Sequence, residues 1–295
     1  MSGFADAQHV AFLELEELAP YRTLRRPMAH AEQGIFVAEG EKAGLLTDTH
    51  AHICDTAFDA DRIEVLERAR DAGIAAVIAV GETLADAQKN IDLAKTHMML
   101  RPAAGLYPTQ LSLERAAEMH TFIRNHREKL IAIGEVGLDY WAVQEEAQQE
   151  LQREIFRGFV ALARELDLPL NVHSRSAGRR AVEFLLGHGA ARVQLHAFDG
   201  KSAAALPAVE AGFFFSIPPS VVRSEQKRKL VQRLPLESLL VETDSPVLGP
   251  APQVRNEPAN ILLSVKAIAE IKGISEAQVV EAVCENTRRL YRDIP

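Results

Sequence analysis

The sequence predicts an α/β protein, a (β/α)8 TIM barrel with a short N-terminal extension, and three observations support this fold class. From Leu45 onward, short apolar runs alternate with amphipathic stretches long enough for helices, as strand–helix units require. The apolar runs are nearly continuous in Val, Ile, Leu and Ala, which is typical of strands covered on both faces. The first run ends in DTHAH, where a doubly wound open sheet would need a glycine-rich phosphate turn.

The apolar runs predict strands that are each followed by a candidate helix. The predicted strands are Leu45–His52, Ala75–Gly81, Leu100–Leu106, Leu130–Val136, Leu170–Ser174, Val193–Ala197, Phe213–Ile217 and Leu239–Thr243. Ser275 followed by Gln278 has the pattern of a capping box, which predicts a last helix through Leu290, packed on the outside of the barrel. Residues 45–295 thus form the predicted barrel.

Residues 1–44 do not follow the strand–helix rhythm. The piece LEELAPYRTLRRPMAHAEQGIFVAEGEK resembles the start of the substrate-binding region of SpoU-type RNA methyltransferases, without the rest of that domain. We expect an extension of unknown role that packs loosely, rather than an RNA-binding module.

The composition excludes several classes of protein. A hydrophobic fraction of 47% and a charged fraction of 25% are those of an ordinary globular chain, so disorder is not expected. No run approaches the ~18 apolar residues of a membrane span, and MSGFADAQHV lacks the features of a signal peptide. Cys54 and Cys284 lie far apart in sequence, which favours reduced thiols. We therefore expect a cytoplasmic protein, a monomer, with no membrane partner.

The net charge of -8 opposes general attraction to a polyanion. A nucleic-acid substrate would therefore be held weakly, by bound metals and local arginines.

A cluster of polar residues ends the first predicted strand. Side chains two residues apart on a strand share a face, so Asp48, His50 and His52 are expected to project together. Two imidazoles on one face can bind one metal ion. By itself the HxH pattern is equally compatible with two ordinary histidines.

Other polar residues recur at the carboxyl ends of predicted strands, where a barrel places its active site. They are Glu135 in GEVGLD, His173 in NVHSR, His196 in LHAFDG and Asp244 in ETDSP. Burying such groups costs several kcal/mol unless they are paired or bound to metal. Their recurrence favours one shared site over unrelated core polar groups.

This set of imidazoles and carboxylates suits two divalent ions about 3.5–4 Å apart, for which zinc, manganese or magnesium are the candidates. We predict Glu135 as the bridge between them. One ion takes His50, His52, Glu135 and Asp244, and the other takes Glu135, His173 and His196. Cys54 can face the same pocket if the strand continues, but an inert thiol is the simpler interpretation.

The predicted catalytic residues are Asp244 and Glu135. A metal-bound water has its pKa lowered towards ~7, which makes hydroxide available at neutral pH. Asp244 is the candidate that takes the proton of this water, and this role is compatible with a ligand role.

Phosphate oxygens that do not bind metal need cationic or hydroxyl donors. Ser174, Arg175, Ser245 and Arg255 lie in or near loops at the predicted mouth. An internal salt bridge is the alternative for Arg175, and tying down the loop after the eighth strand is the alternative for Arg255. Tyr140 and Trp141 follow GEVGLD, where an exposed ring can stack a nucleobase or simply pack in the loop.

Taken together, these residues resemble the TatD family of metal-dependent hydrolases within the amidohydrolase superfamily. DTHAH, GEVGLD, VHSR, LHAF and ETDSP occur in the family's order, from about Leu46 to Leu290. NVHSRSAGR, FFSIPPSVVRS and ETDSPVLGP are most similar to the branch called TatD DNase domain-containing protein 3. The resemblance implies a TIM barrel, a binuclear centre and DNase or phosphodiesterase chemistry, with ligand roles for His50, His52, Glu135, His173, His196 and Asp244.

One position departs from the family pattern. Where the family usually has histidine in GLHP or GVHP, this chain has Tyr107. A tyrosine can donate a hydrogen bond to a substrate but is no ready ligand for zinc.

The predicted function is therefore hydrolysis of an ester bond by a binuclear metal centre, most specifically as a phosphodiesterase or 3′-end-directed deoxyribonuclease. A second hypothesis keeps the metals but makes the target a carboxyl ester or amide, as in deacylation of aminoacyl-tRNA. A third is a catalytically silent nucleic-acid-binding module that uses the basic PYRTLRR segment. An intact ligand set argues against the third.

Overall fold

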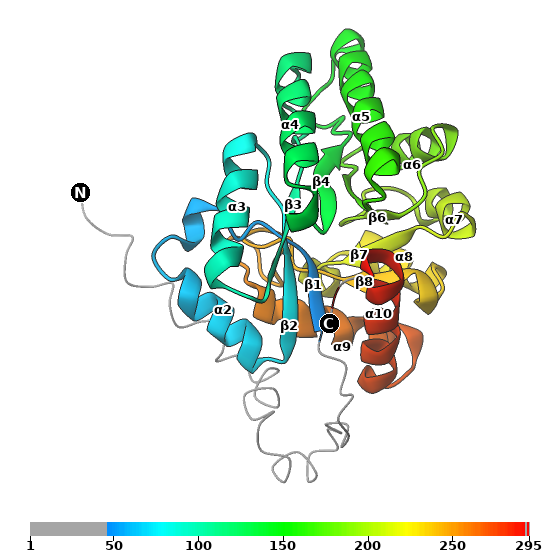
Figure 1. The fold of residues 1–295 in the computed structure, drawn as a ribbon. Coiled ribbons are helices and arrows are strands. Elements are labelled where there is room, and N and C mark those ends of the chain that lie inside the picture. Colours follow the sequence, from blue (N-terminus) through cyan, green and yellow to red (C-terminus); the bar gives the residue numbers. More distant parts are fainter. Residues whose placement is uncertain (1–45, 293, 295) are drawn as a thin grey trace, which may run out of the picture.

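The computed structural model describes residues 46–292 and 294, so the predicted extension over residues 1–44 lies outside the described residues. In this part of the chain, eight strands form one sheet in the order of the sequence, β1 to β8. Neighbouring strands run parallel, and helices lie around the outside of the sheet (Figure 1). The predicted (β/α)8 barrel is confirmed.

The observed strands overlap all the predicted ones and are mostly shorter. They are β1 (Leu46–Ala51), β2 (Ile74–Ala79), β3 (Leu100–Ala104), β4 (Ala132–Gly137), β5 (Leu170–His173), β6 (Val193–Leu195), β7 (Phe214–Ile217) and β8 (Leu239–Val241). Several predicted ends extend too far because the polar residues that follow a strand towards the mouth no longer pair with the neighbouring strand. At β8, for example, the Thr243 amide donates to the Asp48 carboxylate (2.9 Å) instead of to a neighbouring strand.

The helices follow the strands as the alternation predicts. They are α2 (Arg62–Asp71), α3 (Leu84–Thr96), α4 (Leu113–Asn125), α5 (Glu146–Leu166), α6 (Gly178–Gly187), α7 (Ser202–Glu210), α8 (Glu225–Arg233), α9 (Ile261–Lys272) and α10 (Glu276–Tyr291). Single turns of 3-10 helix are η2 (Thr56–Phe58), η3 (Arg127–Lys129), η4 (Pro219–Val222), η5 (Leu236–Ser238) and η6 (Pro258–Asn260). None of these helices is long and apolar enough to cross a membrane.

The barrel closes where β1 meets β8. The Asp244 amide donates to the His50 carbonyl (2.8 Å), and the His52 amide donates to the Ser245 carbonyl (2.8 Å). Further from the carboxyl ends of these two strands, a side chain also joins them: the Thr49 hydroxyl donates to the Val241 carbonyl (2.9 Å). Closure therefore depends on polar side chains of β1 as well as on the backbone ladder.

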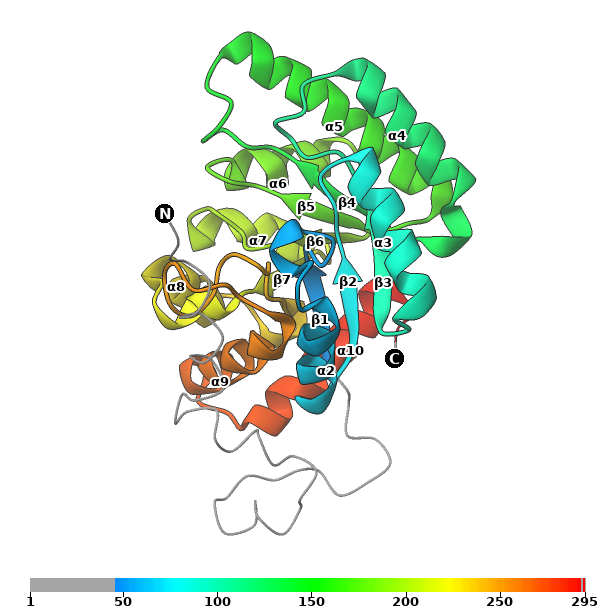
Figure 2. The same cartoon turned by 90° about the vertical axis from the view of Figure 1, so that its left-hand side faces the viewer.

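The predicted last helix is confirmed, and the Ser275–Gln278 capping box begins it. Its predicted place outside the barrel is wrong for its final turn. Leu290 and Tyr291 belong to a buried cluster with alternate residues of the strands, such as Ile78 and Leu240, which face the barrel interior. The other face of α10 packs on α9, and Figure 2 shows α10 beside the base of the strands. The end of the helix thus fills the lower end of the barrel.

Polar contacts inside the barrel hold the end of α10 in place. The Tyr291 hydroxyl donates to Gln194 Oε1 (2.5 Å) and accepts from Asn171 Nδ2 (3.3 Å). Tyr291 is 2% exposed, and Gln194 and Asn171 are completely buried. Because these side-chain amides have no access to water, the Tyr291 hydroxyl gives them a hydrogen-bond partner that water cannot provide.

We expect Tyr291→Phe to lower the free energy of unfolding by about 1–3 kcal/mol, because it leaves the buried Gln194 oxygen without this donor. Urea unfolding followed by circular dichroism measures the change. Tyr140→Phe is the matched control, since the Tyr140 hydroxyl meets Arg153 in a partly buried position. Equal effects of the two variants would contradict this stabilising role of the Tyr291 hydroxyl.

Candidate metal centre

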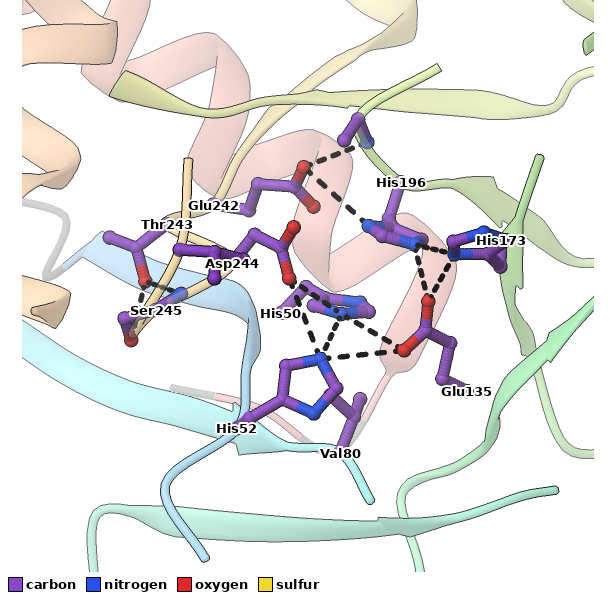
Figure 3. Close-up of polar contacts among 12 residues, drawn as sticks. His50, His52, Val80, Glu135, His173, His196, Glu242, Thr243, Asp244 and Ser245 are labelled. Atoms are coloured by element: carbon purple, nitrogen blue, oxygen red, sulfur yellow. Dashed lines mark hydrogen bonds and ion pairs between the residues drawn. The ribbon is translucent and has the colours of Figure 1, made fainter. Parts of the chain in front are cut away.

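All six predicted ligand residues meet at the carboxyl ends of the strands (Figure 3). Their side chains form three overlapping groups of three residues. Within each group, the possible ligand atoms lie within 4.8 Å of one another. The groups are His50, His196 and Asp244; His50, His52 and Glu135; and Glu135, His173 and His196. Residues separated by almost two hundred positions in sequence thus form one cluster.

Glu135, on β4, lies at the centre of this cluster. Its Oε1 accepts from His173 Nδ1 (2.6 Å) and His196 Nε2 (2.7 Å). Its Oε2 faces His52 Nε2 at 3.4 Å and His50 Nε2 at 3.9 Å. Although burial raises the pKa of this carboxyl, the surrounding imidazoles hold it well below its ordinary value. The carboxylate therefore lies between two pairs of imidazoles.

Asp244 follows β8 and faces the imidazoles of His50, on β1, and His52, just after β1. Its Oδ1 is 3.4 Å from His50 Nε2 and 3.5 Å from His52 Nε2. The residue has a left-handed φ of 55°, which aspartate tolerates better than most residues. Burial opposes its charge, but hydrogen bonds from His50 and His52 leave the pKa of Asp244 far below its ordinary value. It is ionised at neutral pH.

The imidazoles differ in protonation. The rings of His50 and His196 stack with centroids 3.8 Å apart, an arrangement that disfavours two positive charges. Burial and the facing His50 lower the pKa of His196 to about 4. Burial also opposes the charge of His173, yet Glu135 and Asp139 raise the pKa of that ring to about 9. A metal cation that replaced these protons would face the same ring nitrogens and carboxylate oxygens.

Two residues that the sequence prediction did not single out hold the outer ring nitrogens. Asn171 Oδ1 lies 2.8 Å from His50 Nδ1, and Asp139 Oδ2 lies 3.0 Å from His173 Nε2. Such partners fix ring orientation and leave the opposite nitrogen facing the centre. A signal was present for both, because Asp139 ends GEVGLD and Asn171 lies two residues before His173 on the same face of β5.

Glu242 is a third residue that was missed. It is completely buried two residues before Asp244, where it accepts from Ser216 and from the Ala197 amide (2.8 Å). Burial raises the pKa of its carboxyl to about 8. His196 Nδ1 lies 4.0 Å from Glu242 Oε1 and has no hydrogen-bond partner among the described residues.

The predicted substrate-binding residues have different surroundings. Tyr107 lies edge-on to His173 with ring centroids 5.0 Å apart, and burial raises the pKa of its hydroxyl. Ser174 is buried, and its hydroxyl has no hydrogen-bond partner among the described residues. The Ser245 hydroxyl lies 3.0 Å from Thr243 Oγ1.

The two predicted arginines are both engaged within the protein. The Arg175 guanidinium lies 3.7 Å from the centroid of the Trp141 ring. Arg255 contacts both carboxylate oxygens of Asp61 (2.7 and 2.5 Å) and the Ala57 carbonyl (2.7 Å). Arg255 thus ties the loop after β8 to η2 and α2, in agreement with the alternative prediction for it. Cys54 is buried, and burial raises the pKa of its thiol to about 11.

A TIM barrel with four histidines and two carboxylates at its mouth defines the class of barrel hydrolases that work with metal ions. Comparison with known proteins gives the particular family. The model of TatD related DNases matches residues 47–292. The chain therefore belongs to the TatD family, and its predicted identity as a TatD-type enzyme is confirmed.

Individual relatives agree with this assignment. Deoxyribonuclease TATDN3 of Homo sapiens is 44% identical, over 83% of this chain and 94% of the human protein, which confirms the predicted branch. The 3'-5' ssDNA/RNA exonuclease TatD of Erwinia tasmaniensis is 31% identical over 83% of this chain and 98% of its own. The crystal structure of the TatD homologue YJJV of Escherichia coli superposes with a TM-score of 0.79 and 26% identity, covering 85% and 99% of the two chains.

Cation binding should release a proton from His173, because a ring with a pKa of about 9 is protonated at neutral pH. We expect the proton of His173 to contribute a rise in the affinity for Mn²⁺ or Zn²⁺ of up to about tenfold per pH unit between pH 6.5 and 9. Calorimetric titration in buffers of different ionisation enthalpy measures the released proton.

Asp139→Asn provides the comparison, because it removes one of the charges that raise this pKa. The variant should release less of a proton at neutral pH and show a flatter pH dependence. A wild-type affinity that does not change over this range would contradict the coupling.

Proposed function

We propose that this protein hydrolyses phosphodiester bonds of nucleic acid, from the 3′ end, with two divalent cations at the mouth of the barrel. The observation that carries the proposal is the Glu135 carboxylate, placed between His173 and His196 on one side and His50 and His52 on the other. A bridging carboxylate between two imidazole-rich sites is typical of binuclear hydrolases.

The donors fit two cations. The first would be held by His50, His52, Glu135 and Asp244, and the second by Glu135, His173 and His196. Glu135 Oε2 is a buried oxygen without a hydrogen-bond partner among the described residues, which a bound cation would supply. Imidazole and carboxylate donors suit zinc or manganese, and carboxylates also suit magnesium.

When bound, the cations lower the pKa of water and offset negative charge on a phosphoryl oxygen. Asp244 is ionised and faces the same space, so it can accept the proton that water releases. Glu135 holds the imidazoles in fixed positions, and Asn171 and Asp139 hold two of them from behind. The protein itself thus supplies a base and a fixed set of donors.

For the substrate, we propose that the hydroxyls of Tyr107, Ser174 and Ser245 and the guanidinium of Arg175 contact phosphate oxygens. Support for Ser174 is its buried hydroxyl, which follows His173 directly and lacks a hydrogen-bond partner among the described residues. Arg255 is left out because Asp61 occupies its guanidinium.

The substrate class follows the names of the relatives, a human deoxyribonuclease and a bacterial 3'-5' ssDNA/RNA exonuclease. No feature of the site favours a carboxyl ester or amide. We also propose a cytoplasmic location, supported by two buried cysteines that form no disulfide.

Glu135→Ala should remove metal-dependent hydrolysis of bis-p-nitrophenyl phosphate, with a loss of more than about 100-fold, because one substitution affects both cation sites. Bound metal, measured by mass spectrometry on the same samples with and without added manganese, should fall as well. Glu135→Gln keeps the shape and should fail in the same way. Normal turnover by a folded Glu135 variant would overturn the proposal.

Removal of residues 1–44 tests the binding-module hypothesis. The family match begins at residue 47, so we expect the shortened chain to keep its metals and hydrolyse the diester at a rate within about twofold of the full chain. Loss of nucleic-acid binding in the shortened chain, together with full binding by the Glu135 variants, would favour the binding module instead.

A further inference from the structure

Trp141 is the only tryptophan in the chain, and 58% of its surface is exposed. Tryptophan buries more apolar area than any other residue when it packs, so an exposed indole forgoes a large stabilisation. Its neighbour Tyr140 packs against the core instead, and its hydroxyl accepts a hydrogen bond from Arg153 (2.9 Å). Of the two rings after GEVGLD, Trp141 is therefore the one available to a ligand.

The backbone around Trp141 is held in place. Asp139 Oδ1 accepts from the amides of Trp141 (3.0 Å) and Ala142 (2.8 Å). The Tyr140 amide donates to the Arg175 carbonyl (3.0 Å), and Gln144 Nε2 donates to the Trp141 carbonyl (3.2 Å). The exposed ring thus stands on a fixed turn and not on a loose loop tip.

Arg175 supports one face of the indole. Its guanidinium lies 3.7 Å from the ring centroid, which is the geometry of a cation–π contact. Trp141 remains 58% exposed with Arg175 in place, so Arg175 covers only part of this residue. We call Trp141 and Arg175 together the ledge.

The ledge is connected to the candidate metal centre through one carboxylate. Asp139 holds the Trp141 turn with Oδ1 and contacts His173 Nε2 with Oδ2 (3.0 Å). Arg175 is also two residues after His173. The ledge is therefore linked to His173, a proposed ligand of the metal centre, through Asp139 and through the chain itself.

We propose that the ledge stacks a nucleobase of the substrate next to the phosphodiester that is cleaved, so that Trp141 is a substrate-binding residue. This inference rests on the proposed function and adds a binding residue for its substrate. A nucleobase with an uncovered face can lie on the exposed part of the indole. Arg175, behind the ring, adds positive charge near the backbone of the strand.

The single tryptophan makes the ledge directly observable, because all indole emission comes from it. Metal-free protein is titrated with a short single-stranded thymidine oligonucleotide and with an abasic strand of equal length. We expect the oligonucleotide alone to quench the emission in a saturable way. Absence of quenching, or equal quenching by the abasic strand, would overturn the proposal.

Kinetics give an independent test. Trp141→Ala should raise KM for the oligonucleotide by about 5- to 100-fold, with kcat changed less, and leave KM for the abasic strand within about twofold. Trp141→Phe keeps a ring and should recover part of the loss. Met98→Ala truncates another exposed side chain, just before β3 at the other end of the barrel, and should change neither KM.

The outcomes separate this inference from the proposed function. A protein that hydrolyses no diester refutes the proposed function, while the fluorescence titration still decides whether the ledge binds a base. Full hydrolysis with equal KM changes for both strands refutes the ledge and leaves the hydrolase intact.

Discussion

The cluster at the mouth depends on how the barrel closes between β1 and β8. Two backbone hydrogen bonds and the buried Asp48 carboxylate join the strands at that seam. Burial raises the pKa of Asp48 to about 7, and the Thr243 amide and hydroxyl offset part of that cost. Because the seam aligns the ends of both strands, His50 and His52 come to lie beside Asp244. Closure of the barrel thus brings together the three residues of the cluster that β1, β8 and the segments after them contribute.

Charge is the second constraint on the mouth. Glu135 and Asp244 are buried and ionised, and an unpaired buried carboxylate is costly. Protonated imidazoles can balance them, as the raised pKa of His173 shows, but the stacked His50 and His196 limit how many rings carry a proton. A divalent cation balances the carboxylates and lets the rings be neutral. The donor set is therefore better matched to cations than to protons.

Much of this arrangement could be predicted from sequence because it follows local patterns. Alternation of side chains on a strand placed His50 with His52, and strand ends placed Glu135 beside them. The position of the end of α10 could not be predicted, since it depends on contacts between elements that are distant in sequence. Amphipathicity identifies a helix, but it does not say whether the last turn of that helix enters the barrel.

Asp139 links the proposed base-binding ledge to the proposed metal centre. Glu135 and Asp139 belong to the same short segment, and both contact His173, through opposite ring nitrogens. The second oxygen of Asp139 fixes the turn that carries Trp141. A displacement of this turn would therefore move the exposed indole and release His173 from its outer partner together. The position of a base on the ledge and the position of a ligand of the proposed metal centre are thus set by one buried carboxylate.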